Sequence, residues 1–195
     1  YIYTLSETMR ACRDAGVPVT VLDRPNPISA HVVEGGPIDP AYESFVGAHG
    51  LPPRYGLTIG ELARYFELAA APGCEVEVVW MSGYDRCVFF DETGLPWPLP
   101  SPNLPNVDTA VLYPGVCLFE GTTVSEGRGT TRPFEMVGSP WIDGEELSTR
   151  MRAHGLPGVA FSPVSFTPWM SKHEGRPCGG TLVHVVDRAA VESVR

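Results

Sequence analysis

Basic residues are scarce in this sequence of 195 residues. Lys and Arg number 14 against 23 Asp and Glu, which gives a formal net charge of −9. Proteins bind nucleic acid through clustered Lys and Arg side chains that displace counterions from the phosphates. The acidic balance therefore excludes nucleic acid as the expected partner. The sequence also lacks an apolar run near the roughly 20 residues of a membrane-spanning helix, so no membrane span is expected in this segment.

Cysteine and histidine are sparse too, and they lack the spacing of metal sites. The five cysteines form no CxxC pair, and the five histidines form no HExxH or i,i+4 pair. Free buried thiols are therefore expected rather than a disulfide framework or a zinc site. The nucleophile elbow GxSxG, the phosphate loop GxxxxGK[ST] and a GxGxxG after a strand are also missing. We expect no metal and no cofactor.

Proline and glycine, in contrast, are abundant. The chain has 20 prolines and 21 glycines, above the average usage of roughly 5% and 7%. The prolines gather in stretches such as "DRPNPI" and "GLPWPLPSPNLP", so much of the chain is expected to be loop. The second stretch, residues 94–105, is too rich in proline for regular helix or strand. We place a domain boundary there and divide the chain into residues 1–96 and 97–195.

The first part opens with a helix and a strand. The opening stretch reads as the later part of a helix that ends at Gly16. Residues 17–22 form an apolar, β-branched run typical of a parallel strand buried on both faces. Asp23 follows at the carboxyl end of this strand, where ligands bind in open α/β sheets, although a turn or cap role would explain it equally well. Because the chain has no initiator Met and stops just after a strand-like alternation, we expect truncation at both ends.

A second helix and strand complete this pattern. Residues 58–70 predict a helix with a capping box of Thr58 and Glu61, which explains Glu61 structurally. Residues 76–80 alternate as a strand with Trp80 on the inward face. We therefore expect the two strands to be neighbours or near neighbours in a mostly parallel sheet of an α/β fold.

The second part is expected to be a smaller mixed α+β domain. Residues 139–155 predict a helix ended by Gly155, while "GVAFSPVSF" and "GTLVHVV" read as strands. The chemistry is then expected in loops, where carboxylates lie beside glycines: Glu34 in "VVEGGP", and Glu120 and Glu126 in "LFEGTTVSEGRGTTRPFE". Glycosidic bonds are commonly cut by a pair of carboxyl groups, although each of these residues also fits a surface turn.

Several collinear motifs carry a resemblance to a known family. "VLDRPNPI", "VEG" followed by a proline, "GLTIGELA", "SPNLP", "LYPG", "FEGTTVSEGRGTTRPFE", "GSPWID" and "GVAFSPVSFTP" resemble the NamZ-type exo-β-N-acetylmuramidases in order and spacing. The resemblance covers essentially the whole chain. It implies a partial Rossmann-like domain followed by a smaller domain, with the active site in the cleft between them. The implied activity is release of N-acetylmuramic acid from the non-reducing end of peptidoglycan-derived saccharides, in a secreted or periplasmic setting.

The resemblance also implies roles for individual residues. Glu34 matches the glutamate of the family's "VEGP" and is the candidate catalytic carboxylate. Arg128 lies where a guanidinium would meet the lactyl carboxylate of muramic acid, because Arg pairs with carboxylates bidentately. We expect Glu34 and Arg128 to face a common cleft. The substrate-binding candidates are Asp23, Arg24, Asn26, Asn103, Glu120, Ser125, Glu126 and Arg128.

Two other functions stay open at this stage. The protein could be a saccharide-binding relic that keeps the cleft without the chemistry, which the absence of a second carboxylate across from Glu34 would favour. It could also be a Rossmann-type oxidoreductase or transferase, which a nucleotide bound near Asp23 would favour.

Overall fold

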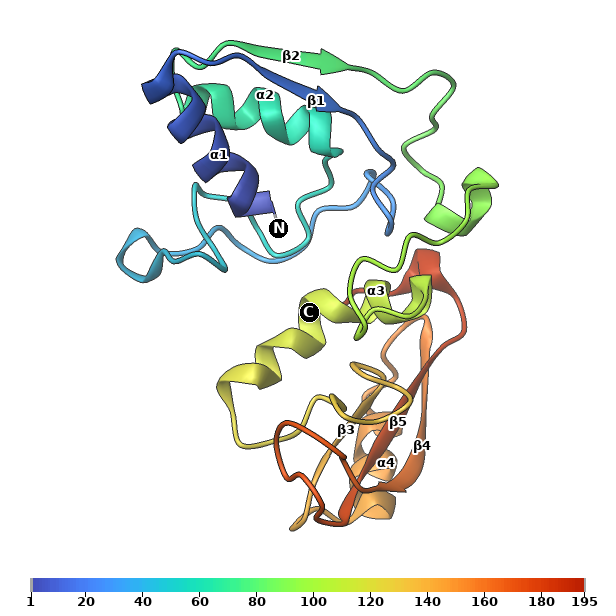
Figure 1. The fold of residues 1–195 in the computed structure, drawn as a ribbon. Coiled ribbons are helices and arrows are strands. Elements are labelled where there is room, and N and C mark those ends of the chain that lie inside the picture. The colour runs from blue at the N-terminus through green and yellow to red at the C-terminus, as the bar shows by residue number, and fades with distance from the viewer. Residues whose placement is uncertain (1, 195) are drawn as a thin grey trace. The chain divides into compact units, whose positions relative to one another are not determined.

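The computed structural model describes residues 2–194, which fold into two compact units divided between Pro96 and Trp97. Figure 1 shows the elements of both units. Within residues 2–194, the first unit contains two α-helices and a two-stranded parallel sheet, and the second contains two α-helices and a separate three-stranded antiparallel sheet. The chain is thus a mixed α/β protein. Within residues 2–194, no helix is both long and apolar enough to cross a membrane.

The first unit follows the predicted order of elements. Helix α1 (Ile2–Ala15) ends at Gly16, whose φ of 66° is in the left-handed region. Strand β1 (Val19–Leu22) and strand β2 (Val76–Val79) lie side by side and parallel, with Val19 opposite Val76. Helix α2 (Ile59–Ala69) connects them. The predicted parallel pairing across a helical connection is confirmed.

The N-terminus of α2 has the predicted capping box. The Thr58 side chain accepts a hydrogen bond from the backbone N–H of Glu61, and the Glu61 carboxylate accepts one from the backbone N–H of Thr58. These bonds satisfy donors that a helix N-terminus leaves without partners. The structural explanation of Glu61 is confirmed. Its carboxylate also pairs with Arg86 at 2.7 Å.

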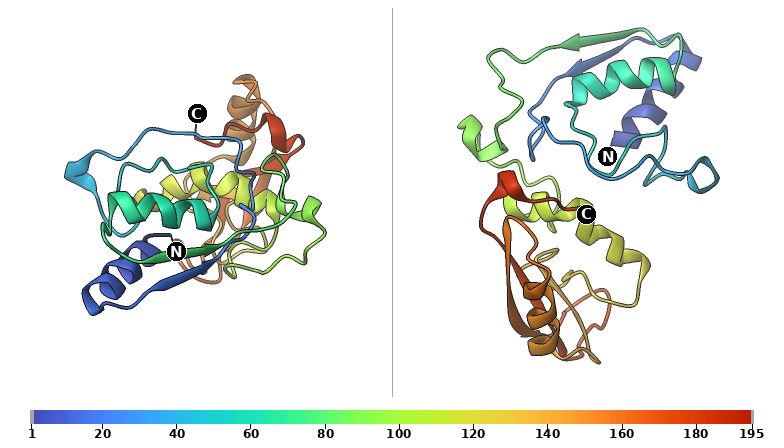
Figure 2. Two further views of the ribbon diagram at one scale, coloured as in Figure 1. Left: turned by 90° about the horizontal axis from the view of Figure 1, so that it is seen from above. Right: turned by 180° about the vertical axis from the view of Figure 1, so that it is seen from behind.

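The core of the first unit lies on one side of its sheet. Helices α1 and α2 lie on the same side of strands β1 and β2 (Figures 1 and 2). Buried side chains of these four elements form one apolar cluster. Val21 and Val78 face this cluster, whereas Leu22 is 67% exposed and Trp80, just past the end of β2, is 53% exposed. The predictions that residues 17–22 are buried on both faces and that Trp80 points inward are therefore wrong. Among residues 2–194, the two helices cover only one face of this sheet.

The second unit is built on an antiparallel sheet. Its strands are β3 (Met136–Ser139), β4 (Val159–Phe166) and β5 (Cys178–Val185), in the order β3-β5-β4. Helix α4 (Gly144–Ala153) packs on β4 and β5, where Ser148 Oγ donates a hydrogen bond to Thr181 Oγ1 at 2.9 Å. The predicted helix before Gly155 and the two predicted strands are confirmed.

Strand β3 and one helix of this unit were not predicted. Helix α3 (Val107–Val116) starts at Asn106, whose side chain accepts a hydrogen bond from the Thr109 N–H. Helix α3 contains Pro114 and follows the proline-rich stretch, and both features hide its helical periodicity in the sequence. Residues 94–105 themselves contain no helix or strand, as predicted. The five cysteines are free thiols, as predicted, but only Cys74 and Cys178 are buried, so the prediction that all five are buried is wrong.

Candidate functional site

The candidate catalytic residue Glu34 is held by a buried arginine. The backbones of Glu34 and Arg54 form an isolated antiparallel bridge, and the Arg54 guanidinium forms an ion pair with the Glu34 carboxylate. The side chains of Arg54 and Glu34 are 2% and 11% exposed, respectively. Arg54 Nη2 also donates to the carbonyl of Ile28 at 2.9 Å. Glu34 therefore has a fixed position and a cationic partner.

Three predicted site residues follow β1, namely Asp23, Arg24 and Asn26. Asp23 and Asn26 organise the loop that leads to Glu34. Asp23 is buried, and its Oδ1 accepts hydrogen bonds from the backbone N–H groups of Gly60 at 2.8 Å and Arg24 at 3.0 Å. A carboxylate at the N-terminus of α2 is favoured by the helix dipole. A Cβ at Gly60 would come within 2.9 Å of Asp23, so this close approach requires glycine.

Asn26 and Arg24 differ in their surroundings. The Asn26 side chain is buried, donates to the Leu57 carbonyl at 2.9 Å and accepts from the Ile28 N–H at 3.1 Å. The Arg24 side chain is exposed. The cap interpretation thus accounts for Asp23, and Asn26 ties the loop to the start of α2.

The segment 118–135 of the second unit forms a glycine-rich loop against the sheet. The backbones of Ser125 and Gly138 form an isolated antiparallel bridge, which joins the loop to β3. Gly127 and Gly129 have φ of 82° and 76°, which non-glycine residues rarely adopt. A Cβ at Gly129 would lie 2.4 Å from the carbonyl oxygen of Met170. The glycines therefore allow the loop to pack against the segment after β4.

This loop brings four of the predicted residues together, namely Glu120, Ser125, Glu126 and Arg128. Arg128 Nη2 pairs with Glu120 at 2.8 Å, and its Nε pairs with Glu126 at 3.3 Å. The guanidinium also lies over the ring of Phe134, with 4.9 Å between its carbon and the ring centroid. An arginine in this arrangement keeps its orientation while its side chain stays 28% exposed. It is suited to meet an anionic ligand.

Lys172 completes this charged cluster from a different segment. Its Nζ donates to the carbonyl oxygens of Phe119 at 2.7 Å and Val124 at 3.1 Å, and to Glu126 Oε2 at 3.0 Å. Glu126 is only 2% exposed, and Lys172 and Arg128 together compensate its charge. We call the group Glu120, Glu126, Arg128 and Lys172 the charged cluster.

Two residues of these sites were missed from the sequence. Arg54 lies between prolines and a glycine, and Lys172 lies in a polar stretch, so nothing local marks either as the partner of a glutamate. Only the requirement that each buried glutamate has a cationic partner would have pointed to them. Asn103, the remaining predicted residue, lies in the loop before α3, where its N–H donates to Ser101 Oγ at 3.3 Å. Sequence reasoning thus found the carboxylates and one counterion, Arg128, but not Arg54 or Lys172.

The thiol nearest this cluster is poorly suited to nucleophilic chemistry. Burial, with a smaller contribution from the Glu120 carboxylate, raises the pKa of the Cys117 thiol to about 11. Thiolates are the reactive form, so Cys117 is inert near neutral pH. Within residues 2–194, no group of three or more His, Cys, Asp or Glu side chains is arranged to hold a metal ion.

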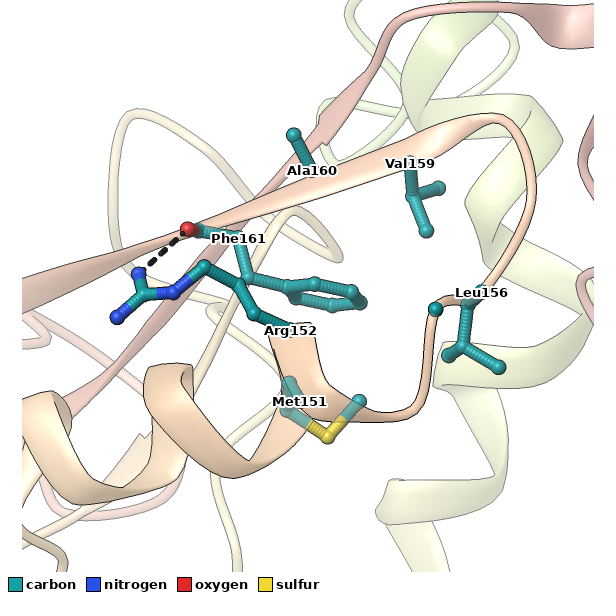
Figure 3. A pocket seen from close by; sticks show the side chains of 7 residues that line it. Met151, Arg152, Leu156, Val159, Ala160 and Phe161 are labelled. Carbon is teal, nitrogen blue, oxygen red and sulfur yellow. Dashed lines mark hydrogen bonds between the residues drawn. The ribbon is translucent and has the colours of Figure 1, made fainter.

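A separate cavity lies at the C-terminal end of α4 (Figure 3). It has a volume of about 210 Å³ and is lined mainly by apolar side chains, among them Met151, Leu156, Val159 and Phe161. Ligand pockets usually have volumes of about 300–1,000 Å³. None of the predicted site residues lines this cavity, so it is not part of the candidate site.

Comparison with known families gives two matches that cover nearly the whole chain. Residues 1–108 match the model of the N-terminal domain of the exo-β-N-acetylmuramidase NamZ, and residues 111–195 match the model of its C-terminal domain. The two matches lie in the same order as the names of the domains imply.

Individual relatives are similar over the same extent. The chain is 46% identical over all 195 residues to the peptidoglycan β-N-acetylmuramidase NamZ of Bacillus subtilis (strain 168), and it covers 47% of that protein. Crystal structures of two DUF1343 family proteins from Bacteroides fragilis are also similar. One (BF0371) has a TM-score of 0.92 at 35% identity, over 98% of this chain and 50% of its own. The other (BF0379) has a TM-score of 0.73 at 32% identity, over 96% and 49%. The chain thus spans about half the length of the relatives it matches.

Proposed function

Since the chain belongs to the exo-β-N-acetylmuramidase NamZ family, we propose that it serves the hydrolytic release of N-acetylmuramic acid from the non-reducing end of peptidoglycan fragments. The observation that carries this proposal is the pair of adjacent family matches over residues 1–108 and 111–195. The 46% identity to a peptidoglycan β-N-acetylmuramidase supports it. The biological setting would be turnover and salvage of the cell wall.

Glu34 is proposed as a catalytic carboxylate. Its partner Arg54 is almost fully buried, and the ion pair between them holds the Glu34 carboxylate in one orientation. Glycoside hydrolysis uses one carboxyl group as the proton donor and a second as base or nucleophile. The ion pair with Arg54 suits Glu34 to the second of these roles. The proton donor would then be another carboxyl group.

Arg128 is proposed to recognise the lactyl carboxylate, the substituent that distinguishes muramic acid from glucosamine. Its guanidinium is partly exposed, stacked on Phe134 and oriented by Glu126. Glu120 holds Nη2 through a partly exposed ion pair, and such pairs are worth only about 0–1 kcal/mol. A substrate carboxylate would displace Glu120 at little cost in free energy.

We also propose that residues 1–96 form the C-terminal part of a Rossmann-like domain, and that residues 97–195 form a smaller mixed α+β domain. The parallel pairing of β1 and β2 across α2 supports the first assignment. The antiparallel sheet of the second unit supports the second assignment.

The proposal is tested with a full-length family member that carries residues 1–195. Turnover of a synthetic muramic acid glycoside is measured by release of the sugar, with circular dichroism as a control for folding. Glu34→Gln keeps an acceptor for Arg54 and should lose at least about 100-fold in turnover, the lower range for acid–base catalysis. The matched control Glu75→Gln changes an exposed carboxylate of the same unit and should retain activity. Failure of the unmodified protein to release the sugar would overturn the proposed function.

A further inference from the structure

Trp141 is an exposed aromatic side chain in the loop between β3 and α4. It is 60% exposed, whereas tryptophans are highly buried on average. Exposed tryptophans are over-represented where proteins bind ligands, because the ring offers a large apolar face at a small cost in conformational entropy. The exposure of Trp141 therefore leaves its ring accessible to a ligand.

The ring of Trp141 is held in place. It makes a T-shaped contact with the imidazole of His173, with 5.2 Å between the ring centroids and an angle of 89° between the planes. His173 is itself fixed, because its Nε2 lies 2.7 Å from the carbonyl oxygen of Thr123 in the glycine-rich loop. Edge-to-face pairs of this kind stabilise one orientation of the rings. Trp141 is thus an ordered platform rather than a loose surface side chain.

The backbone that carries His173 is strained. Ser171 and His173 both have positive φ, 72° and 60°, a region that residues with a Cβ rarely adopt. Such conformations cost about 1–3 kcal/mol each and cluster at functional sites. Here the strained segment places two side chains on the same loop: His173 on Thr123, and Lys172 on Glu126. The segment that supports the ring of Trp141 therefore also supports the charged cluster.

We infer that Trp141 is a stacking platform for the pyranose ring of an N-acetylhexosamine. This inference rests on the proposed function and gives a role to Trp141, which lies in the motif "GSPWID" but had no assigned role. A pyranose ring with equatorial substituents has an apolar face of axial C–H groups and a polar rim. The apolar face packs on the indole, whose negative π-face attracts the C–H hydrogens. Arg128 belongs to the glycine-rich loop that holds His173 through Thr123, and it supplies the complementary recognition of charge. The two residues then recognise different features of a muramic acid saccharide.

The test measures binding and turnover separately. The 195-residue chain is titrated with the disaccharide of N-acetylmuramic acid and N-acetylglucosamine by isothermal calorimetry. Trp141→Ala should weaken binding by about tenfold, while Trp141→Phe should recover part of the affinity. His173→Ala should weaken binding less than Trp141→Ala, because it removes only the support of the ring.

Trp169→Ala is the matched control. Trp169 is in the same unit and is 71% exposed, but it makes no ring contact with any of residues 2–194, so its removal should change affinity by less than about twofold. Equal losses for the two tryptophans, no loss for Trp141→Ala, or no binding of the disaccharide by the unmodified chain would each overturn the inference.

Turnover distinguishes the failure of this inference from failure of the proposed function. In the full-length family member, Trp141→Ala should raise KM and leave kcat within about threefold, because stacking holds the substrate and the transition state alike. If Trp141→Ala releases the sugar with an unchanged KM, the stacking role of Trp141 is overturned while the proposed function stands. No release by the unmodified protein would overturn the proposed function, and the calorimetric titration would still decide the role of Trp141.

Discussion

The ion pair of Glu34 and Arg54 makes a quantitative prediction about the stability of the first unit. Glu34→Met would leave the guanidinium of Arg54, 2% exposed, with the Ile28 carbonyl as a remaining acceptor. Removing one partner of a buried pair costs about 3–5 kcal/mol. We expect Glu34→Met to lower the free energy of unfolding by an amount in this range. The loss for Arg54→Met should lie at the lower end of the range, because the Glu34 carboxylate is 11% exposed and keeps some contact with water.

The double variant should be more stable than either single variant. Replacing both members of a buried ion pair with apolar residues is often neutral or stabilising, because the desolvation penalty disappears with the charges. The coupling free energy of the double-mutant cycle should therefore be at least about 2 kcal/mol, towards the upper end of values for residues in contact.

The measurement is urea denaturation of the 195-residue chain followed by circular dichroism, with the slope m compared between variants. The exposed pair of Arg150 and Glu146 on α4, with side chains 74% and 61% exposed, is the matched control. Arg150→Met should cost less than about 0.5 kcal/mol. Additive costs at Glu34 and Arg54, or single costs as small as that of the control, would refute the reasoning.

Three further predictions concern single groups. Glu120→Gln should raise affinity for a muramic acid glycoside by up to about fivefold, because an exposed carboxylate no longer competes for Arg128; weaker binding by calorimetry would contradict this. Burial raises the pKa of Tyr55 to about 12, with a smaller contribution from a neighbouring tyrosine. The unfolded state therefore loses this proton first, and stability should fall between pH 10 and about 12. Tyr55→Phe should flatten that fall in denaturation curves, and identical slopes would disprove it. At pH 8, iodoacetamide should label the exposed Cys87 before Cys117, whose pKa is about 11, as peptide mass spectrometry would show.

The elements with strong local signals were predictable. The capping box of Thr58 and Glu61, the stop at Gly16 and the apolar strands lie in contiguous residues, so short-range chemistry fixes them. The parallel pairing of the strands also followed, because a helix between two strands leaves few other topologies. Helix α3 was missed because its proline and its approach through a proline-rich loop hide its periodicity.

The sequence by itself determined which loops place carboxylates beside glycines. Glycines beside Glu34, Glu120 and Glu126 marked flexible, charged loops, and the order of the motifs marked the family. These signals are local, so they can be read from the sequence without knowledge of the tertiary structure.

Only the tertiary structure decided how those charges are balanced. Arg54 lies 20 positions from Glu34, and Lys172 lies 46 positions from Glu126. The exposure of Trp80 was likewise decided by the fold, because strand β2 ends at Val79 and Trp80 lies just past that end. Ion pairing and burial depend on distances through space, and a side chain that lies remote in sequence leaves no local pattern at the residue it contacts.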